Sequence, residues 1–205
     1  MASENEVMRE RLGGRAEKIF DSRQMQKLES PERALILPAQ EILLLTGLKS
    51  GQIMADVGAG TGYFSIPAAD IVGANGGVMA ADISSDMLEY LCSKLTEKNK
   101  DIIQLFTSDS MSCGIPDNAA DYLLLCTVLH EAGDPLVMLK DMYRVIKQGG
   151  RCVIVEWIKK PMEKGPSVDH RIAMEDTARC LENAGFRSIQ EHILNNWFYI
   201  LTAQR

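Results

Sequence analysis

Residues 54–62 read MADVGAGTG, an apolar run that breaks into three alternating glycines. The run is part of QIMADV at residues 52–57, and a continuous apolar stretch of this kind is typical of a strand buried on both faces. Glycine occurs where a backbone turns sharply or comes close to another group. The stretch therefore predicts a buried strand that ends in a tight turn, with something else close beside it.

Strand-like and helix-like segments alternate along the rest of the chain. Apolar runs predict strands at residues 52–57, 76–83, 101–107, 119–130 and 151–157. Helical spacing of apolar residues predicts helices at residues 38–48, 61–73, 84–99, 134–150 and 169–186. Two last strands, 187–194 and 197–205, join across Asn195 and Asn196 in a short hairpin. This order predicts an open α/β fold with a mostly parallel sheet, helices on both faces and a C-terminal antiparallel hairpin.

The length, composition and net charge of the chain limit the kinds of protein that it can be. The chain has 205 residues, of which 46% are hydrophobic and 24% charged, with a formal net charge of −6. These values are typical of one globular domain, and the acidic balance argues against a protein that binds nucleic acid by neutralising phosphates. No apolar stretch approaches the ~20 residues that span a bilayer, and the first residues have no signal-peptide core.

The cysteines indicate a compartment. Five of them stand far apart with no CxxC pair, at positions 92, 113, 126, 152 and 180. This spacing suits reduced thiols in the cytoplasm and predicts neither a disulfide framework nor a metal site. Cys126 and Cys152 lie in apolar runs and are expected to be small core residues.

Two parts of the chain differ in character. Residues 1–37 are mostly polar and helix-prone, which predicts an N-terminal extension, and the part from Phe20 to Leu37 is expected to close as a lid over a ligand crevice. The lid hypothesis rests on position alone, because polar helices before the first strand have no place in the sheet. Residues 38–205 carry the strand and helix rhythm and form the main domain.

The glycine turn favours one class of ligand over another. In such sheets the ligand crevice lies at the carboxyl ends of the strands, and dinucleotide sites there use G-x-G-x-x-G. Here the third glycine comes one position early, at Gly62, and Tyr63 follows it. Asp56 also stands where a pyrophosphate would lie, and the two negative charges would repel each other. S-adenosylmethionine carries an ammonium, a sulfonium and a single carboxylate, so this net positive ligand suits an acid-lined crevice.

Further acids follow the next two strands at the same edge of the sheet. Asp82 ends the second strand and is placed to accept hydrogen bonds from both ribose hydroxyls, a use that dinucleotide sites share. Asp109 follows the third strand and is placed to accept from the adenine amino group. Taken singly, Asp82 and Asp109 could instead cap helices or turns. The residues expected to bind the cofactor are Asp56, Gly58, Ala59, Gly60, Gly62, Asp82, Ile83, Met87, Ser108, Asp109 and Ser110.

Together these features resemble the class I S-adenosylmethionine-dependent methyltransferases, in particular the set that includes the ubiquinone and menaquinone C-methyltransferases. The resemblance covers roughly residues 35–205 and is carried by D-x-G-x-G-x-G at residues 56–62, the strand-ending Asp82, Ser108–Asp109 followed by IPDNAADYLLL, and the helix end RVIKQGGR. It implies a Rossmann-like sheet of seven strands with the last one antiparallel, S-adenosylmethionine as cofactor, and a small-molecule methyl acceptor. This chain has Gln148 where the family commonly has proline in K-P-G-G, which alters turn stiffness but no expected ligand contact.

Four residues are candidates for the acceptor side. His130 follows the fourth strand, where members of the resembling family often carry histidine; it could remove a proton from the acceptor or only bond neighbouring backbone. Trp157 ends the fifth strand beside Glu156 and could offer a flat apolar wall or simply cover the sheet. His170 and Arg171 precede the last helix, and Arg171 could clamp an acidic acceptor or be an ordinary polar residue at a helix start.

Three functions stay open at this point. The first is methyl transfer by in-line displacement to a small molecule, with carbon, nitrogen, oxygen and sulfur acceptors all open. The second is an NAD(P)-dependent oxidoreductase, which the missing glycine at position 63 and the presence of Asp56 disfavour. The third is a non-catalytic protein that binds S-adenosylmethionine. No nucleic-acid partner and no membrane span are expected, and a homodimer is compatible with the sequence.

Overall fold

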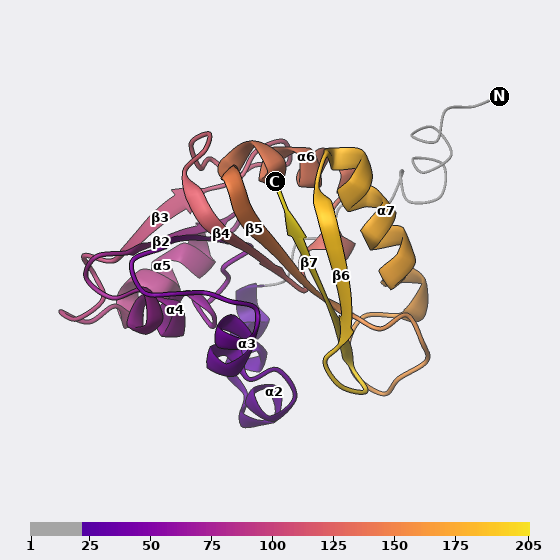
Figure 1. Ribbon diagram of the computed structural model, residues 1–205. Coiled ribbons are helices and arrows are strands. Elements are labelled where there is room, and N and C mark those ends of the chain that lie inside the picture. Colours follow the sequence, from indigo (N-terminus) through magenta and orange to yellow (C-terminus); the bar gives the residue numbers. More distant parts are fainter. Residues whose placement is uncertain (1–21) are drawn as a thin grey trace.

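The computed structural model describes residues 22–205, which contain a seven-stranded sheet (Figure 1). The strands are β1 (Ile53–Val57), β2 (Gly77–Asp82), β3 (Ile103–Thr107), β4 (Ala120–Cys126), β5 (Ile146–Trp157), β6 (Arg187–Ile193) and β7 (Phe198–Gln204). Their order across the sheet is β3-β2-β1-β4-β5-β7-β6. Strands β1 to β5 pair in parallel, whereas β7 runs antiparallel to both β5 and β6. The predicted fold class, including the antiparallel hairpin, is confirmed.

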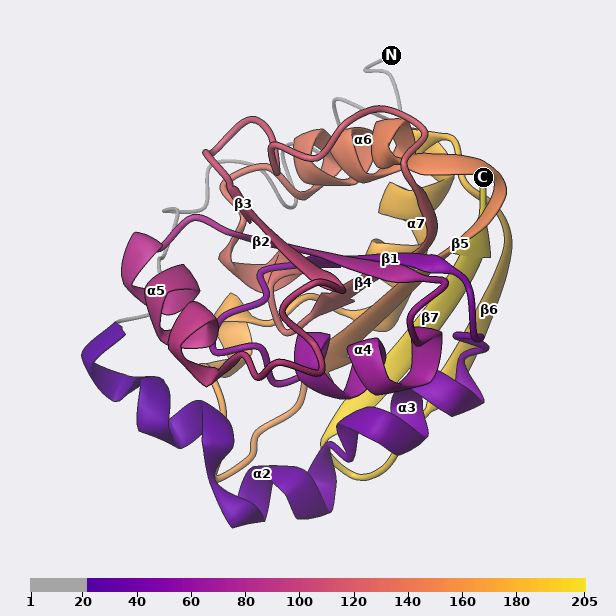
Figure 2. The ribbon, with the colours of Figure 1, turned by 90° about the vertical axis from the view of Figure 1, so that its left-hand side faces the viewer.

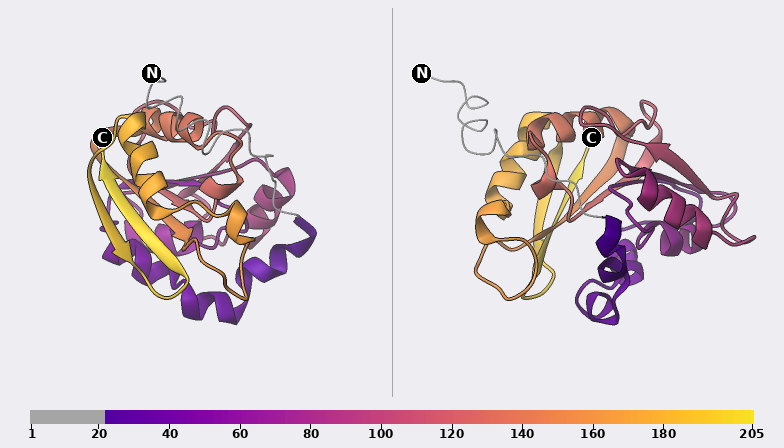
Figure 3. Two further views of the ribbon diagram at one scale, coloured as in Figure 1. Left: turned by 90° about the vertical axis from the view of Figure 1, so that its right-hand side faces the viewer. Right: turned by 180° about the vertical axis from the view of Figure 1, so that it is seen from behind.

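Helices cover both faces of the sheet. The α-helices are α2 (Pro31–Ile36), α3 (Ala39–Leu45), α4 (Ser65–Val72), α5 (Ser85–Lys94), α6 (Pro135–Val145) and α7 (Met174–Ala184), and the 3₁₀ segments are η1 (Ser22–Glu29), η2 (Leu129–Glu131) and η3 (Val168–His170). Figure 2 shows α6 and α7 on one side of the sheet and α3 and α4 on the other. Figure 3 shows α7 beside the β6–β7 hairpin at one edge. No helix within residues 22–205 is long and apolar enough to cross a membrane.

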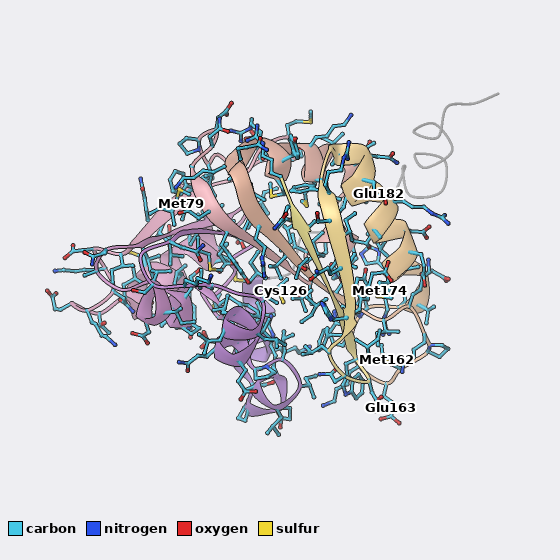
Figure 4. All side chains as sticks on the ribbon, viewed as in Figure 1. Met79, Cys126, Met162, Glu163, Met174 and Glu182 are labelled. Atoms are coloured by element: carbon cyan, nitrogen blue, oxygen red, sulfur yellow. The ribbon has the colours of Figure 1, made fainter. Side chains whose placement is uncertain are left out.

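The central strands are buried on both faces, which explains their continuous apolar sequences. Side chains alternate between the faces of a strand, so Leu123 and Leu125 of β4 pack in the core under α6 and α7. Tyr122 and Leu124 of the same strand pack in the second core, under α3 and α4. Cys126 also lies in that second core, near the middle of the molecule in Figure 4, and it is buried as predicted.

Element boundaries differ from the predicted ones where the chain leaves a helix. Helix α6 was expected to reach residue 150, but it ends at Val145, and Ile146 already pairs with Ala120 as the start of β5. Helix α5 was expected to reach residue 99 but ends at Lys94, because the Asn99 side chain accepts from the Thr96 N–H and closes a separate turn. Local side-chain bonds of this kind compete with helix continuation.

Candidate active site

A cavity of about 900 Å³ lies at the carboxyl ends of the central parallel strands. The register explains why these ends meet, because Val57 of β1 pairs with Ala81 of β2 and with Leu125 of β4. The chain segments that follow β1, β2, β3 and β4 all line the cavity. Sequence positions far apart are thus brought to one rim of the sheet, as expected for a parallel α/β fold.

The glycine turn is held to β2 by backbone bonds. The N–H groups of Gly58 and Ala59 donate to the Ala81 carbonyl at 2.8 and 3.0 Å. Gly58 has a φ of 75°, and a Cβ atom there would lie 2.2 Å from a methyl group of Val128. The absence of a side chain therefore lets the turn after β1 contact the turn after β4.

Gly62, unlike Gly58 and Gly60, does not line the cavity. It was expected to bind the cofactor, but it is absent from the cavity wall. A Cβ atom at Gly62 would lie 2.2 Å from a methyl group of Leu91 on α5. This third glycine therefore serves the close packing of the turn against a helix, whereas Asp56, Gly58, Ala59 and Gly60 line the cavity as expected.

Replacing Gly58 by alanine is expected to weaken ligand binding by at least about tenfold, because the clash with Val128 and the left-handed φ together cost roughly 1–2 kcal/mol or more. Gly51→Ala is the matched control: Gly51 has a φ of 80°, but a Cβ atom added there would meet nothing within 4 Å. Calorimetric titration measures ligand affinity and thermal unfolding measures stability in both variants. Gly51→Ala shows only the cost of the left-handed φ, so the difference between the variants gives the effect of the clash with Val128. Equal behaviour of the two variants would contradict the packing explanation.

Asp56 is a buried carboxylate at the carboxyl end of β1. Asp56 is only 3% exposed to solvent. The hydroxyl of Ser65, on α4, donates to Oδ2 of Asp56 at 2.5 Å. Burial raises the pKa of Asp56 to about 6; the Ser65 bond opposes this shift, and the negative charge of Asp82 adds to it. Such a carboxylate is destabilised without a positive partner, so this position is suited to a cationic group of a ligand.

Asp82 closes the glycine turn and still has acceptor capacity. Its Oδ2 accepts from the Gly60 N–H at 2.7 Å and its Oδ1 accepts from the Ser84 N–H at 2.9 Å. Burial raises the pKa of Asp82, and these backbone bonds oppose the shift. An ionised carboxylate has about four lone-pair sites, so both oxygens can each accept a further bond from a ligand hydroxyl.

The turn after β3 supplies the third predicted acid. Asp109 is exposed, and its Oδ1 accepts from the N–H groups of Met111 and Ser112, both at 2.8 Å. The carboxylate therefore organises its own turn, which is the capping alternative raised from the sequence, while the residue also lines the cavity. The other predicted residues of this side that line the cavity are Ile83, Met87, Ser108 and Ser110.

His130 lies in η2, directly after β4, and pairs with a buried glutamate. Its Nδ1 is 2.9 Å from Oε2 and 3.0 Å from Oε1 of Glu156, and its backbone N–H donates to Oε1 at 3.2 Å. Both residues are buried, but only His130 lines the cavity. Because a carboxylate only accepts hydrogen bonds, the pair places a proton on Nδ1 and leaves Nε2 as the basic nitrogen.

The partnership of His130 and Glu156 was not predicted from the sequence, where Glu156 was named only as the neighbour of Trp157 at the end of the fifth strand. The order of the strands could have indicated this pairing. Glu156 is the second-last residue of β5, the neighbour of β4, and Cys126 at the end of β4 pairs with Val155. Residues that follow these two strand ends were therefore bound to be close.

The remaining acceptor candidates fall in different places. Trp157 lines the cavity and packs against Phe198 with ring centroids 4.3 Å apart. His170 lies behind His130, with ring centroids 5.6 Å apart, and is not part of the cavity wall.

Arg171 is also outside the cavity wall, and it is 1% exposed. Its guanidinium donates to the carbonyls of the loop after β5, namely those of Ile158, Lys160, Lys164 and Pro166. Four such bonds to backbone fit a residue that fixes a loop rather than one that clamps an acceptor.

The segment before β1 contributes to the cavity more than position alone suggested. Of the stretch expected to act as a lid, Phe20 lies outside the described residues, but η1 and α2 contribute side chains to the wall. The residues of this segment in the wall are Lys27, Leu28, Ser30, Glu32, Arg33, Ile36 and Leu37. All of them lie in the predicted lid, but none was given an individual role from the sequence, because their path over the strand ends is set by tertiary packing.

Comparisons with known proteins agree with this geometry. The chain is 34% identical over 109 residues to the demethylmenaquinone methyltransferase of Geobacillus sp. (strain WCH70), covering 53% of this chain and 47% of that protein. It is 32% identical over 117 residues to the Listeria monocytogenes serotype 4a (strain HCC23) enzyme of the same name, covering 57% and 49%. The chain thus spans about half the length of the curated relatives it matches.

A solved structure matches over nearly the whole described chain. It is an SAM-dependent methyltransferase from Aquifex aeolicus, with a TM-score of 0.85, 27% identity, and coverage of 90% of this chain and 98% of that one. The sequence profile of the ubiE/COQ5 methyltransferases matches residues 36–168, which hold the glycine turn, the strand-end acids and the His130–Glu156 pair. The resemblance seen in the sequence is confirmed, and the chain belongs to the ubiE/COQ5 methyltransferase family.

Proposed function

We propose that this protein transfers a methyl group from S-adenosylmethionine to a small-molecule acceptor. The observation that carries the proposal is the pair of buried carboxylates, Asp56 and Asp82, beside a glycine turn in one cavity. Their charge suits a ligand with an ammonium and a sulfonium, and it disfavours the pyrophosphate of a dinucleotide. The donor set therefore fits S-adenosylmethionine better than NAD(P).

Each part of the cofactor has a complementary group on this chain. Asp82 would accept from the ribose hydroxyls with its remaining lone pairs, and Asp109 would accept from the adenine amino group. Ile83 and Met87, which line the same side of the cavity, would cover the adenine ring. Asp56 would lie on the side of the ammonium.

The chemistry requires little covalent participation by the protein. When bound, S-adenosylmethionine supplies an electrophilic methyl group on a sulfonium. The residues of this chain then align the acceptor, exclude water from the cavity and take up a proton at Nε2 of His130. Orientation of reactants can account for several kcal/mol of barrier lowering, roughly 7–11 kcal/mol in the best cases, and general-base assistance for about 10²- to 10⁴-fold.

Beside the acids Glu131, Asp134 and Asp141, the acceptor side of the cavity has an apolar wall. It is formed by the turn after β4, by α6 and by the ends of β5 and β7, through Val128, Val137, Met138, Met142, Trp157 and Phe198. This wall suits a flat apolar ring, and the relatives named demethylmenaquinone methyltransferases make a hydroxylated quinone-type ring the first acceptor to test. The acidic balance and free cysteines support a cytoplasmic protein that acts without nucleic acid.

The direct test combines binding and activity. Calorimetric titration with S-adenosylmethionine, S-adenosylhomocysteine and NADH is expected to give binding of the first two only. Labelled S-adenosylmethionine is then incubated with purified protein and a cell extract, and mass spectrometry identifies the methylated product. Binding of NADH alone would support the oxidoreductase, and cofactor binding without any labelled product would support a non-catalytic binding protein.

Cofactor affinity is expected to fall as the pH drops through about 6. Asp56, whose pKa burial raises to about 6, loses its charge below that pH and with it the attraction for the ammonium. At pH 5 roughly nine-tenths of a group with this pKa is neutral, so the affinity should be about tenfold lower than at pH 8. Titrations between pH 5 and pH 8 measure this dependence.

Asp56→Asn is the control for that assignment. This variant should remove most of the dependence of cofactor affinity on pH. It should also stabilise the ligand-free fold at pH 7. The direction follows from the raised pKa of Asp56. The folded state keeps the Asp56 proton up to a higher pH than the unfolded state, so the free energy of unfolding falls as the pH rises and the buried carboxyl becomes charged. An asparagine carries no charge at any pH and avoids this loss. A variant that retains the wild-type pH profile would contradict the role of Asp56.

A further inference from the structure

Arg33 is a cavity residue that the proposed chemistry does not yet use. It lies on α2, is half-buried and lines the cavity. Its guanidinium carbon is 4.4 Å from the centroid of the Tyr63 ring, and its Nη1 donates to the Leu28 carbonyl at 2.7 Å. Among residues 22–205, the Leu28 carbonyl is the one group that accepts a hydrogen bond from the Arg33 guanidinium. A guanidinium has five N–H donors, so most of this capacity is available to a ligand.

The segment that carries Arg33 is held over the glycine turn by contacts with the rest of the protein. The Tyr63 hydroxyl donates to the Leu37 carbonyl at 2.7 Å, and the Asn195 side chain donates to the Ile36 carbonyl at 2.6 Å. At the other end of the segment, Glu29 pairs with Lys94 of α5. Because the segment is anchored at both ends by contacts within the protein, the position of Arg33 is fixed, and a fixed position reduces the ordering cost of binding.

The position of Arg33 along the cavity can be read from its neighbours. Arg33 lies over the ring of Tyr63, which follows β1, and the Ile36 carbonyl on the same helix accepts from Asn195 in the turn between β6 and β7. In agreement with this position, the positive charge of Arg33 opposes the rise that burial causes in the pKa values of Asp56 and Cys126. Asp56 belongs to β1 and Cys126 ends β4, whereas the predicted adenine contact, Asp109, follows β3 at the other end of the strand order. Arg33 therefore lies on the opposite side of the glycine turn from the adenine end, where the amino-acid tail of the cofactor would extend.

That tail carries two charges of opposite sign. Asp56 complements its ammonium but leaves its carboxylate without a partner, and a carboxylate in a partly buried site needs a cation or several N–H donors. The Lys and Arg residues in the described cavity wall are Lys27, Arg33 and Lys164. Of these, only Arg33 presents a planar fork that matches a carboxylate with two parallel bonds.

We propose that Arg33 binds the carboxylate of the methionine part of S-adenosylmethionine, so that η1 and α2 form one wall of the cofactor site. The inference rests on the proposed function, because it needs that cofactor. It makes Arg33 a specificity residue, which distinguishes S-adenosylmethionine from otherwise identical ligands that lack the carboxylate.

The test compares S-adenosylmethionine with its decarboxylated form, which keeps the sulfonium and the ammonium. Calorimetric titration of the wild-type protein should give about 10- to 100-fold tighter binding of S-adenosylmethionine, the range expected for charge-assisted bonds. Arg33→Met should lower that affinity to the level of the decarboxylated ligand and leave the latter unchanged within about twofold. Arg33→Lys should retain part of the discrimination, because it keeps the charge and loses the fork.

Matched controls are the two lysines of the described cavity wall, replaced in Lys27→Met and Lys164→Met, and both variants should retain the wild-type discrimination. Thermal unfolding of each variant confirms that it folds. Discrimination that persists in Arg33→Met, or disappears in either lysine variant, would overturn the assignment to Arg33 while leaving the proposed function intact. A wild-type protein that binds neither ligand would overturn the proposed function itself, and with it this inference.

Discussion

Replacing Asp82 by alanine should weaken S-adenosylmethionine binding by about 10²- to 10⁴-fold, since two bonds from ligand hydroxyls to a buried carboxylate are worth roughly 1.5–3 kcal/mol each. A second effect adds to the first. Asp82 also accepts from the backbone N–H groups of Gly60 and Ser84, so its loss removes one of the bonds that hold the glycine turn to β2. Calorimetric titration with S-adenosylhomocysteine measures the combined loss.

Two further variants separate these effects. Asp82→Asn keeps one oxygen as acceptor for a backbone N–H but cannot accept at both positions, so its affinity should lie between those of the wild type and Asp82→Ala. Asp101→Ala removes an exposed carboxylate near the start of β3, away from the cavity wall, and should change nothing. Wild-type affinity in a folded Asp82→Ala variant would remove the main support for the proposed function.

Replacing His130 by alanine should lower kcat by about 10²- to 10⁴-fold and leave the KM for S-adenosylmethionine nearly unchanged, provided that the acceptor loses a proton in the reaction. The reason is that the Glu156 contact at Nδ1 makes Nε2 the basic nitrogen of His130, and His130 lines the cavity with Glu131 Oε1 3.9 Å from this nitrogen. His192→Ala is the matched control, because His192 is exposed on β6. A kcat within about threefold of the wild type would mean that His130 only shapes the pocket.

Glu156 is a positioning residue, and its test needs a readout beyond rate. Glu156→Gln keeps the size of the side chain and an acceptor for the His130 ring but removes the negative charge that favours the imidazolium. The acid limb of the pH–rate profile should therefore move to lower pH, with a fall in kcat smaller than that of His130→Ala. A lower rate with an unshifted profile would indicate that Glu156 acts only through packing.

Several features of the fold follow from local sequence alone. The continuous apolar runs, the alternation of strands with helices and the glycine turn after β1 depend on short-range spacing, and each was read correctly. Ser84 caps α5, accepting from the Met87 N–H at 3.4 Å, and Gly185 ends α7 in the left-handed conformation. These ends are predictable because a cap needs only a side chain or a φ value within one turn of chain.

The acidic rim could also be predicted, for a topological reason. The carboxyl ends of neighbouring parallel strands share one edge of the sheet, so residues directly after β1, β2 and β3 had to meet. The same reasoning would have paired His130 with Glu156. The glycine turn and the acids at the strand ends also allowed the family to be recognised from the sequence.

Tertiary structure decided the rest. Whether Gly62 meets the ligand or Leu91, whether Arg171 reaches the cavity or the carbonyls of its own loop, and whether α2 brings Arg33 over the glycine turn all depend on contacts outside the local turn or strand. Local propensity constrains a residue's backbone, but the direction and partner of a long side chain are set by packing among elements distant in sequence. The sequence alone therefore determined the sheet, its acidic rim and the family, whereas the place of Arg33, the partners of Arg171 and the shape of the acceptor wall came only from how helices and loops pack over that sheet.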